Sequence, residues 1–315
     1  MNPLRAAVVG AGYLGRFHAE KYQALPGVEL VAVVDIDAER ARRVAAANQA
    51  GALFDHAELA GRVDVASVVV PTQAHYAVAS DLLDAGIHVL VEKPLTASVA
   101  QGRALIERAA ACGRVLQVGH VERFNPVMQC LFEQVDQPDF IETNRVAPFT
   151  PRGSDVDVVL DLMIHDIDLV LRLVPVPLVE IEASGSAVLT DQIDVAHAHL
   201  RFADGCVASL TASRVAGARV RRIRLFQRNA CFIADLAARQ LRISRRCGRA
   251  EGAAQFQTRG IEVPPIDALG SEIAAFVRAV RQDELPPVSG AEGLRALQIA
   301  AVVSERIEQR RGAMH

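Results

Sequence analysis

The sequence predicts an α/β fold: an N-terminal doubly wound parallel sheet, then a C-terminal α+β domain with an open, largely antiparallel sheet. Two observations predict it. In the first part of the chain, short apolar runs alternate with helical stretches, which is typical of parallel strands joined by helices. Beyond residue 120, strand-like runs follow one another before two closing helices. We therefore expect one domain over residues 1–119 and another over 120–315, with the closing helices able to pack back on the first domain.

Charge, hydropathy and cysteine content exclude several classes of protein. The 315 residues carry a formal net charge of −3, whereas nucleic-acid-binding domains tend to be strongly basic. No apolar run approaches the roughly 18 residues of a membrane span, and the apolar run within residues 1–9 is too short for a signal peptide. The five cysteines form no CxxC pair, which favours reduced thiols over disulfides or a zinc site. We expect a cytoplasmic protein without a metal, which binds neither nucleic acid nor membranes.

The N-terminal domain opens with a strand, a glycine-rich turn and a helix. An apolar run at 6–9 leads into the sequence GAGYLG and then a helical stretch at 14–24. In this context the GxGxxG spacing indicates a Rossmann dinucleotide-binding domain, with the pyrophosphate at the helix N-terminus. The first glycine permits the tight turn, the second lets the pyrophosphate approach, and the third lets helix and strand pack closely. The predicted cofactor contacts here are Gly10, Gly12, Tyr13, Leu14 and Gly15.

A carboxylate at the end of the second strand bears on the choice of cofactor. Asp35 follows the apolar run 29–34, where a carboxylate would accept hydrogen bonds from the adenosine ribose. A 2′-phosphate placed there would meet like charge, and the nearest cation that could reach round is Arg40. The sequence therefore favours NAD over NADP.

Further residues fall at the carboxyl ends of the later strands. These strands are expected at 64–70, 87–91 and 115–118, and the helices between and before them at 37–48, 75–85 and 98–111. Doubly wound sheets bind ligands beyond the carboxyl ends of their strands. A histidine after the 64–70 strand has two possible roles, to cover the nicotinamide end of the cofactor or to cap its own helix. The predicted cofactor contacts at this edge are Pro71, Thr72, His75, Glu92 and Lys93.

Lys93 is unusual for this chain. It is one of two lysines, the other being Lys21, while the remaining cationic side chains are arginine. Lysine can take part in acid–base chemistry that arginine cannot perform. Because Lys93 lies at the ligand-binding edge, we favour a functional role over that of a solvated surface cation.

The C-terminal domain is expected to be rich in strands. The sequence predicts a helix at 127–134, strands at 140–146 and 178–189, a hairpin over 196–215 that turns at Asp204-Gly205, further strands within 220–243, and helices at 268–282 and 292–310.

One segment of this domain has candidate acid–base residues. Between residues 156 and 173, Asp161, His165 and Asp168 are spaced i, i+4 and i+7, so a helix would present them on one face. A carboxylate one turn from a histidine can orient the imidazole and raise its basicity. A solvated helix face is the plainer alternative. A metal site is less favoured, since no second His/Cys cluster completes it.

Four segments in order carry a resemblance to a known family: GAGYLG at 10–15, PTQAH at 71–75, EKP at 92–94 and DLMIH at 161–165. With these, the chain resembles the glucose-fructose oxidoreductase / inositol dehydrogenase / rhizopine catabolism (Gfo/Idh/MocA) family of NAD(P)-dependent oxidoreductases. The resemblance implies homodimers or homotetramers formed through the C-terminal sheet. It also implies a small-molecule substrate, a sugar or nucleotide sugar.

Carried over by position, the resemblance assigns roles to several residues. Lys93 matches the lysine of the EKP motif, and Asp161 and His165 match the paired acid and base. Arg123 and Asn125 match a segment that contacts substrate. His120 departs from the usual residues at its position and is left unassigned.

The implied reaction is hydride transfer between a secondary hydroxyl of a sugar and nicotinamide. The segments RFNP and DLMIHDID resemble members that oxidise the 3-hydroxyl of UDP-N-acetylglucosamine-type sugars. His165 is the candidate base, with Asp161 orienting it or the substrate, and Lys93 would stabilise charge on the oxygen. Alternatively, Lys93 itself accepts the proton. Dehydrogenation of another sugar or polyol, and a non-catalytic NAD(H) sensor, stay open as other functions.

Overall fold

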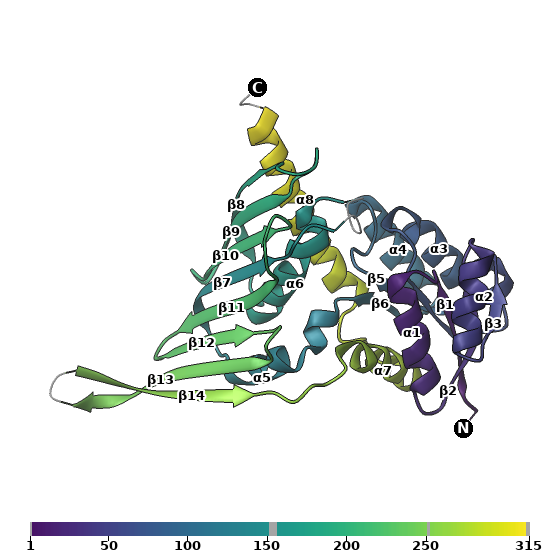
Figure 1. The fold of residues 1–315 in the computed structure, drawn as a ribbon, viewed down its shortest axis with the longest axis horizontal. Helices are drawn as coiled ribbons and strands as arrows, with labels where there is room; N and C mark the ends of the chain where they lie inside the picture. The colour runs from purple at the N-terminus through teal and green to yellow at the C-terminus, as the bar shows by residue number, and fades with distance from the viewer. Residues whose placement is uncertain (1, 151–155, 251–252, 313–315) are drawn as a thin grey trace. The chain divides into compact units, whose positions relative to one another are not determined.

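The protein divides into two compact units, seen here in a computed structural model that describes residues 2–150, 156–250 and 253–312 (Figure 1). The first unit contains residues 1–121 and 267–295, and the second contains 122–266 and 296–315. The first unit thus takes up a segment that lies late in the chain, and the division falls within the last helix.

The first unit contains a six-stranded parallel sheet with the strand order β3-β2-β1-β4-β5-β6, which is the Rossmann order. The prediction of a doubly wound parallel sheet is confirmed. The short β3 and a 3₁₀ turn after it, His56–Leu59, were not expected, because three residues give too little periodicity to detect. The strands are β1 Leu4–Val9, β2 Val28–Val34, β3 Gly51–Leu53, β4 Val65–Val68, β5 His88–Glu92 and β6 Leu116–Gly119.

Helices complete the first unit. The last of them, α7, packs against α1, and its Ile273 and Phe276 are fully buried in the same apolar core as Tyr22. Lys21 on α1 forms an ion pair with Asp267 at the N-terminus of α7, with 3.0 Å between Nζ and Oδ2. The helices are α1 Tyr13–Ala24, α2 Ala38–Ala47, α3 Thr72–Asp84, α4 Val99–Ala111 and α7 Ala268–Gln282.

The second unit contains an eight-stranded sheet with the order β14-β13-β12-β11-β7-β10-β9-β8. All neighbours are antiparallel except β7 and β10, so the prediction of a largely antiparallel sheet is confirmed. The expected strand 178–189 ends at residue 186, and β14 was not expected because its sequence is mostly polar. The strands are β7 Pro138–Val146, β8 Leu178–Ser186, β9 Val195–Phe202, β10 Val207–Ser213, β11 Val220–Gln227, β12 Ala230–Asp235, β13 Gln240–Ala250 and β14 Ala253–Glu262.

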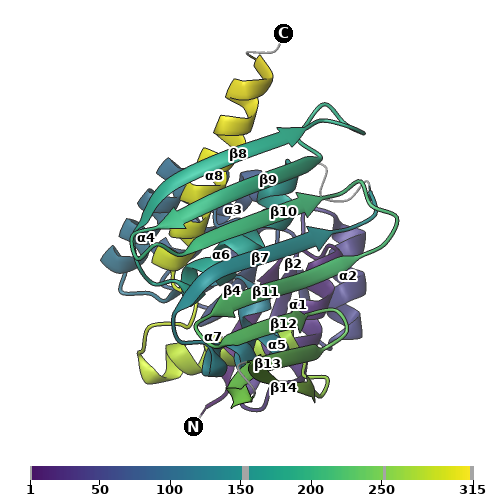
Figure 2. The same ribbon diagram turned by 90° about the vertical axis from the view of Figure 1, so that its left-hand side faces the viewer.

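Helices cover one face of this sheet, and the opposite face is open to view in Figure 2. On the covered face, the apolar core joins Val127 of α5, Ile167 of α6 and Val303 of α8 to inward-facing strand residues. The helical elements are a 3₁₀ turn at Val121–Phe124, which crosses the division between the units, α5 Pro126–Gln134, a π-turn at Val159–Met163, α6 Ile164–Leu173 and α8 Gly290–Gly312.

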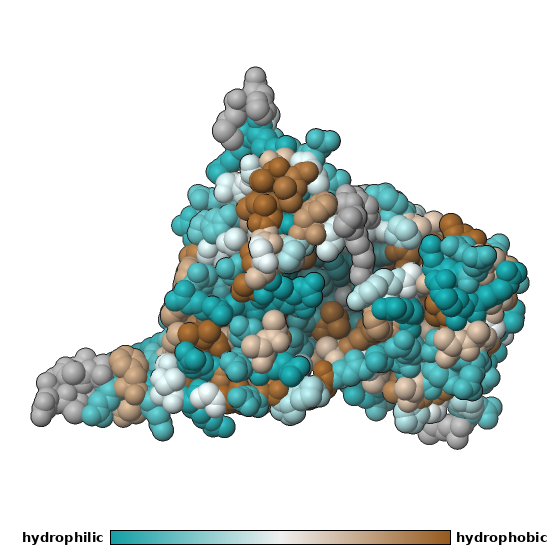
Figure 3. Space-filling view, viewed as in Figure 1, coloured by the Kyte–Doolittle hydropathy of each residue, from teal (hydrophilic) through white to brown (hydrophobic). Residues whose placement is uncertain are grey.

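The surface is mostly hydrophilic in the view of Figure 3, with hydrophobic side chains gathered beside the C-terminal part of α8. Val188 and Leu189, between β8 and β9, are each more than half exposed. Among the described helices, none combines the length and apolar character needed to cross a bilayer.

Candidate active site

The glycine turn has the space and polarity that a dinucleotide pyrophosphate requires. Gly10 has φ +100°, and a Cβ there would lie 2.4 Å from the Val69 carbonyl oxygen. A Cβ on Gly15 would lie 1.8 Å from the carbonyl oxygen of Gly10, so helix and strand can pack closely only with glycine. A Cβ on Gly12 would meet nothing within 4 Å, and no side chain caps the N-terminus of α1. The turn therefore excludes side chains at Gly10 and Gly15, where it packs, and leaves space at Gly12, where the phosphates would bind.

Tyr13 and Leu14 occupy the first turn of α1. Tyr13 is about half exposed and its ring lies edge-on to Phe17, with the guanidinium of Arg16 4.8 Å from the Tyr13 ring centroid. Leu14 is half-buried. Their role as cofactor contacts stays a prediction.

Asp35 is buried and holds the glycine turn in place. One carboxylate oxygen accepts a hydrogen bond from the backbone N–H of Ala11 at 2.8 Å, and the other from that of Asp37 at 2.9 Å. A carboxylate has about four acceptor positions, so Asp35 retains capacity for ribose hydroxyls. Arg40 lies 3.5 Å from Asp35 and 3.2 Å from Asp37, so two carboxylates already balance this cation. The residues therefore fit NAD, and Arg40, the cation expected to reach a 2′-phosphate, is already paired.

His75 connects two loops at the same edge of the sheet. Pro71 precedes α3 and Thr72 begins it, and no side chain caps this helix, so the alternative of a His75 cap is wrong. His75 is buried, with Nδ1 2.9 Å from the Pro94 carbonyl oxygen and Nε2 2.9 Å from that of Val70. Burial lowers the pKa of His75 below its ordinary value. His75 thus stabilises the loop after Lys93, and a contact with nicotinamide stays a prediction.

The segment Glu92-Lys93-Pro94 is held in place by the buried side chain of His18, which contacts Glu92. Glu92 Oε1 lies 3.1 Å from Nε2 of His18, and Oε2 accepts the backbone N–H of Lys93 at 3.2 Å. Burial alone would raise the pKa of Glu92, but the His18 hydrogen bond and the charges of His18 and Lys93 lower it overall. The Lys93–Pro94 peptide bond is cis, and the Lys93 side chain is half-buried.

Sequence reasoning missed His18, although a signal was present. It lies three residues after Gly15, on the face of α1 that packs on the sheet, and it is fully buried. Gly119 leaves room for its partner, because a Cβ there would lie 3.1 Å from the Glu92 Cα. His120, unassigned from the sequence, is buried directly after β6.

In the second unit, the segment with the candidate acid and base is not one regular α-helix. Asp161 lies in the π-turn Val159–Met163, and His165 lies in the first turn of α6. Both side chains are partly exposed, whereas Asp168 is buried. The expectation of one regular helix is therefore wrong at Asp161, where the chain forms a π-turn, and Asp168 on α6 has a partner inside the unit. A π-turn in this place is itself notable, since π-bulges occur frequently at functional sites.

Arg123 and Asn125 also have internal partners. Arg123 is buried and donates to both carboxylate oxygens of Asp168, at 2.7 and 2.8 Å. Asn125 caps α5 by accepting the N–H of Val127 at 3.0 Å, and its amide donates to Glu122 at 3.1 Å. The structure shows what these residues hold together, and their contact with substrate stays a prediction.

A second ionic cluster lies beside the first turn of α6. Arg145 donates to Asp166 at 2.9 and 2.7 Å and to Glu122 at 2.8 Å, and all three are buried. Glu122 also accepts from Arg221 at 3.1 Å. Two arginines thus balance two carboxylates, one of which is adjacent to His165 in sequence.

The candidate residues are distributed over both units. The first unit brings the glycine turn to Asp35 and the loop at Lys93 to His18 and His75. Asp161 and His165 belong to the second unit, together with Arg123 and Asn125. In the part of the chain that the structure describes, no group of three His, Cys, Asp or Glu side chains could hold a metal ion.

Comparison with known proteins gives matches along most of the chain. Residues 4–120 match a sequence model described as an oxidoreductase family with an NAD-binding Rossmann fold, and residues 128–232 match the GFO/IDH/MocA C-terminal domain. A UDP-N-acetylglucosamine 3-dehydrogenase from Acidithiobacillus ferrooxidans is 38% identical over 310 residues, which are 98% of each chain. A myo-inositol 2-dehydrogenase from Thermotoga maritima is 26% identical over 329 residues, covering 98% of this chain and 97% of the other.

Solved structures of dehydrogenases also match over nearly the whole chain. A crystal form of the Acidithiobacillus ferrooxidans enzyme has a TM-score of 0.93 at 38% identity and covers 98% of this chain and 99% of its own. A myo-inositol dehydrogenase from Corynebacterium glutamicum has a TM-score of 0.80 at 24% identity, covering 98% of this chain and 97% of its own, so that likeness concerns the fold.

Proposed function

The chain belongs to the GFO/IDH/MocA family of NAD-binding oxidoreductases, and from this premise we propose that it oxidises the 3-hydroxyl of UDP-N-acetylglucosamine, or a close relative, to a ketone. The observation that carries the proposal is the 38% identity, spanning 98% of both chains, to an enzyme named for this reaction. Inositol dehydrogenases also match over nearly the whole chain, at lower identity. Oxidation of a polyol is therefore the second candidate.

In the proposed reaction, the hydrogen on C3 leaves with two electrons and the hydroxyl proton leaves separately. The residues of the glycine turn and Asp35 would hold NAD, whose nicotinamide would supply the hydride acceptor. His165 takes up the hydroxyl proton, and Asp161 orients the imidazole or the sugar. Lys93, in its cationic form, donates a hydrogen bond to the oxygen as that oxygen becomes a carbonyl. The alternative assignment makes Lys93 the proton acceptor.

Absorbance of NADH during incubation with candidate substrates tests this function. We expect kcat/KM for UDP-N-acetylglucosamine to exceed that for myo-inositol by at least about 100-fold, because a polyol lacks the groups a nucleotide-sugar site would bind. With substrate deuterated at C3, the deuterium should appear in the reduced cofactor, whereas deuterium at C4 should stay in the sugar. Faster oxidation of myo-inositol would favour the polyol. Binding of NADH without turnover of any sugar would favour a sensor.

We also propose that the open face of the second unit's sheet joins copies of this chain into a homodimer or homotetramer. On this face Phe140 and Phe226 lie opposite each other on β7 and β11, stacked with ring centroids 6.0 Å apart. Beside them, Arg224 pairs with Glu142 at 2.8 Å. A stacked aromatic pair with satisfied charges around it resembles the centre and rim of a protein interface.

Replacing Phe140 with aspartate should weaken this association by about 30-fold or more, since interface hot spots contribute about 2 kcal/mol or more. Light scattering during gel filtration should then show a single-chain mass at concentrations where the wild type is oligomeric. Phe54→Asp is the control, because Phe54 is similarly exposed but lies in the first unit. An unchanged mass for Phe140→Asp would contradict an interface on this face.

The cytoplasmic location stays a prediction. All five cysteines are free thiols.

A further inference from the structure

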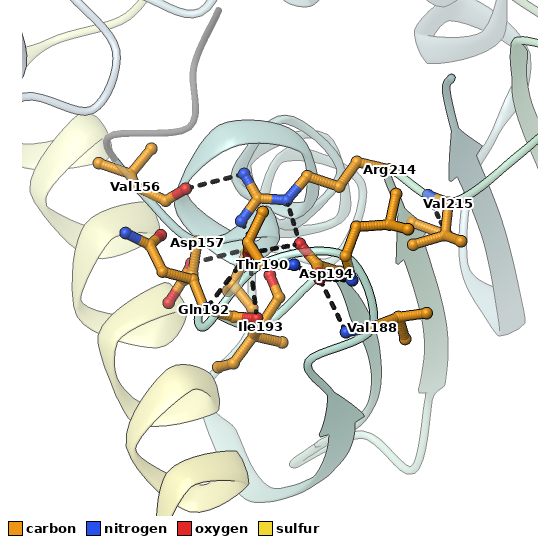
Figure 4. A network of polar contacts seen from close by, with 12 residues as sticks. Val156, Asp157, Val188, Thr190, Gln192, Ile193, Asp194, Arg214 and Val215 are labelled. Atoms are coloured by element: carbon orange, nitrogen blue, oxygen red, sulfur yellow. Dashed lines mark hydrogen bonds and ion pairs between the residues drawn. The ribbon is translucent and has the colours of Figure 1, made fainter. Parts of the chain in front are cut away.

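The segment that carries Asp161 and His165 is fixed at both ends by buried pairs of arginine and aspartate. At the later end, Asp166 and Asp168 are held by Arg145 and Arg123. At the earlier end, a separate network surrounds Asp194 and Arg214 (Figure 4). Neither Asp194 nor Arg214 is among the candidate site residues predicted from the sequence.

Asp194 is a fully buried carboxylate with an unusually complete set of donors. One oxygen accepts three backbone N–H groups, from Val188, Leu189 and Thr190, at 2.8, 2.6 and 2.8 Å. The other accepts the Thr190 hydroxyl at 2.8 Å and Nε of Arg214 at 2.8 Å. Burial opposes ionisation, yet the backbone donors bring the pKa of Asp194 well below its ordinary value. The carboxylate is therefore a fixed negative charge to which Arg214 is bound.

Arg214 uses its remaining nitrogens to hold the chain ahead of the π-turn. Nη1 donates to the Val156 carbonyl at 3.1 Å, and Nη2 donates to the Ile193 carbonyl at 3.3 Å. The same Ile193 carbonyl accepts the N–H of Val158 at 2.9 Å. A planar guanidinium can bind these three groups together, whereas an ammonium would bind them less completely. Arg214 thus connects the end of β10 to residues 156–158.

Asp157 continues this connection into the π-turn. Its Oδ1 accepts the N–H groups of Val159 and Leu160 at 3.0 and 2.9 Å, and its carbonyl accepts the N–H of Asp161 at 2.9 Å. Its Oδ2 accepts the hydroxyl of Ser304 on α8 at 2.7 Å. Figure 4 shows Asp157 between α8 and the Arg214 guanidinium. The backbone that presents Asp161 is therefore fixed from α8 and from the sheet.

We propose that Arg214 and Asp194 are positioning residues, which fix the start of the π-turn so that Asp161 is held where the reaction requires it. This inference rests on the proposed function for the role of Asp161. A π-turn is a rare conformation that needs support from its surroundings. A displacement of about 1 Å at a reacting group can lower the rate by about 100-fold. The network supplies that support without contacting the reacting atoms.

Two variants test the positioning role. Arg214→Lys retains the charge and removes the simultaneous contacts to residues 156 and 193. Ser304→Ala removes one hydrogen bond to Asp157 and leaves the buried charges intact, so it serves if Arg214→Lys fails to fold. Arg222→Lys is the control, because Arg222 is exposed on β11 and pairs with Asp235 at 3.3 Å.

Amide hydrogen exchange gives a readout that does not depend on activity. We expect the peptide spanning residues 157–166 to exchange about tenfold faster in Arg214→Lys and Ser304→Ala than in wild type, and to be unchanged in Arg222→Lys. Unchanged exchange of that peptide in both test variants would overturn the proposal, whatever the substrate.

Kinetics then identify the residue through which the network acts. We expect Arg214→Lys to lower kcat about 10- to 100-fold while the Kd for NADH stays within twofold. The double variant Arg214→Lys/Asp161→Asn should have the same kcat as Asp161→Asn alone. If Arg214 acts only by positioning Asp161, its replacement has no further effect once the Asp161 carboxylate is gone. A multiplicative loss in the double variant would overturn the proposal. Full activity of Asp161→Asn would instead refute the assigned site, with the exchange result still deciding whether Arg214 fixes the π-turn.

Discussion

Lys93→Ala is expected to lower kcat about 10²- to 10³-fold, while the Kd for NADH stays within threefold of the wild-type value. This is the usual loss when a donor to a developing oxyanion is removed. The expectation follows from the position of Lys93 at the end of β5, where Glu92 fixes its backbone N–H and is itself held by buried His18. Steady-state kinetics at saturating NAD, with fluorescence titration of NADH, measure both quantities.

Two further variants provide the control and separate the two possible roles of Lys93. Lys21→Ala changes the chain's other lysine, which pairs with Asp267, and should leave kcat within twofold. Lys93→Arg keeps a cation that cannot serve as a proton acceptor. If Lys93 only stabilises the oxygen, the arginine variant should retain clearly more activity than Lys93→Ala; if Lys93 accepts the proton, both should be equally slow. Near-native turnover of Lys93→Ala would contradict a catalytic role altogether.

The first unit could be predicted from the sequence because its signals are local. A glycine with positive φ, a short apolar strand and an amphipathic helix are each determined within about a dozen residues. Gly10 and Gly15 act as expected, through contacts with Val69 and with the turn itself. The contacts that His18 and His75 make could not be predicted from local patterns. Both are buried histidines whose partners, Glu92 and Pro94, lie far along the chain.

The second unit shows where such reasoning fails. The spacing of Asp161, His165 and Asp168 indicated a helix face, yet the chain forms a π-turn at Asp161, and Asp168 binds Arg123, which is 45 residues away in the sequence. No local pattern specifies an ion pair across that separation. Of the residues with candidate acid–base spacing, only Asp161 and His165 remain partly exposed. The charges beside them in sequence, Asp166 and Asp168, serve to hold the helix in place.

Arg145→Met is expected to destabilise the second unit by about 3–5 kcal/mol at neutral pH, the usual result of removing one partner from a buried ion pair. Arg145 is 3% exposed and contacts both Glu122 and Asp166. Methionine fills similar space but leaves Asp166 without the Arg145 cation and Glu122 with its contacts to Arg221 and Asn125. The chain has no tryptophan, so urea unfolding is best followed by far-ultraviolet circular dichroism. Arg108→Met is the control, since its pair with Asp84 is exposed, belongs to the first unit and should contribute less than about 1 kcal/mol.

The pH dependence of this loss distinguishes buried charge from lost packing. Burial alone would raise the pKa of Glu122, but Arg145 and Arg221 lower it overall, so Glu122 stabilises the wild-type fold at neutral pH and less as the pH falls. The pKa of Asp166 is raised, mainly by burial and against the effect of Arg145. Without Arg145, the pKa of both carboxyls must rise, so their burial costs most when they are ionised and least when acid protonates them. The difference in unfolding free energy between wild type and Arg145→Met should therefore shrink from pH 7.5 to pH 5. A difference that stays constant over this range would show that Arg145 acts through packing alone.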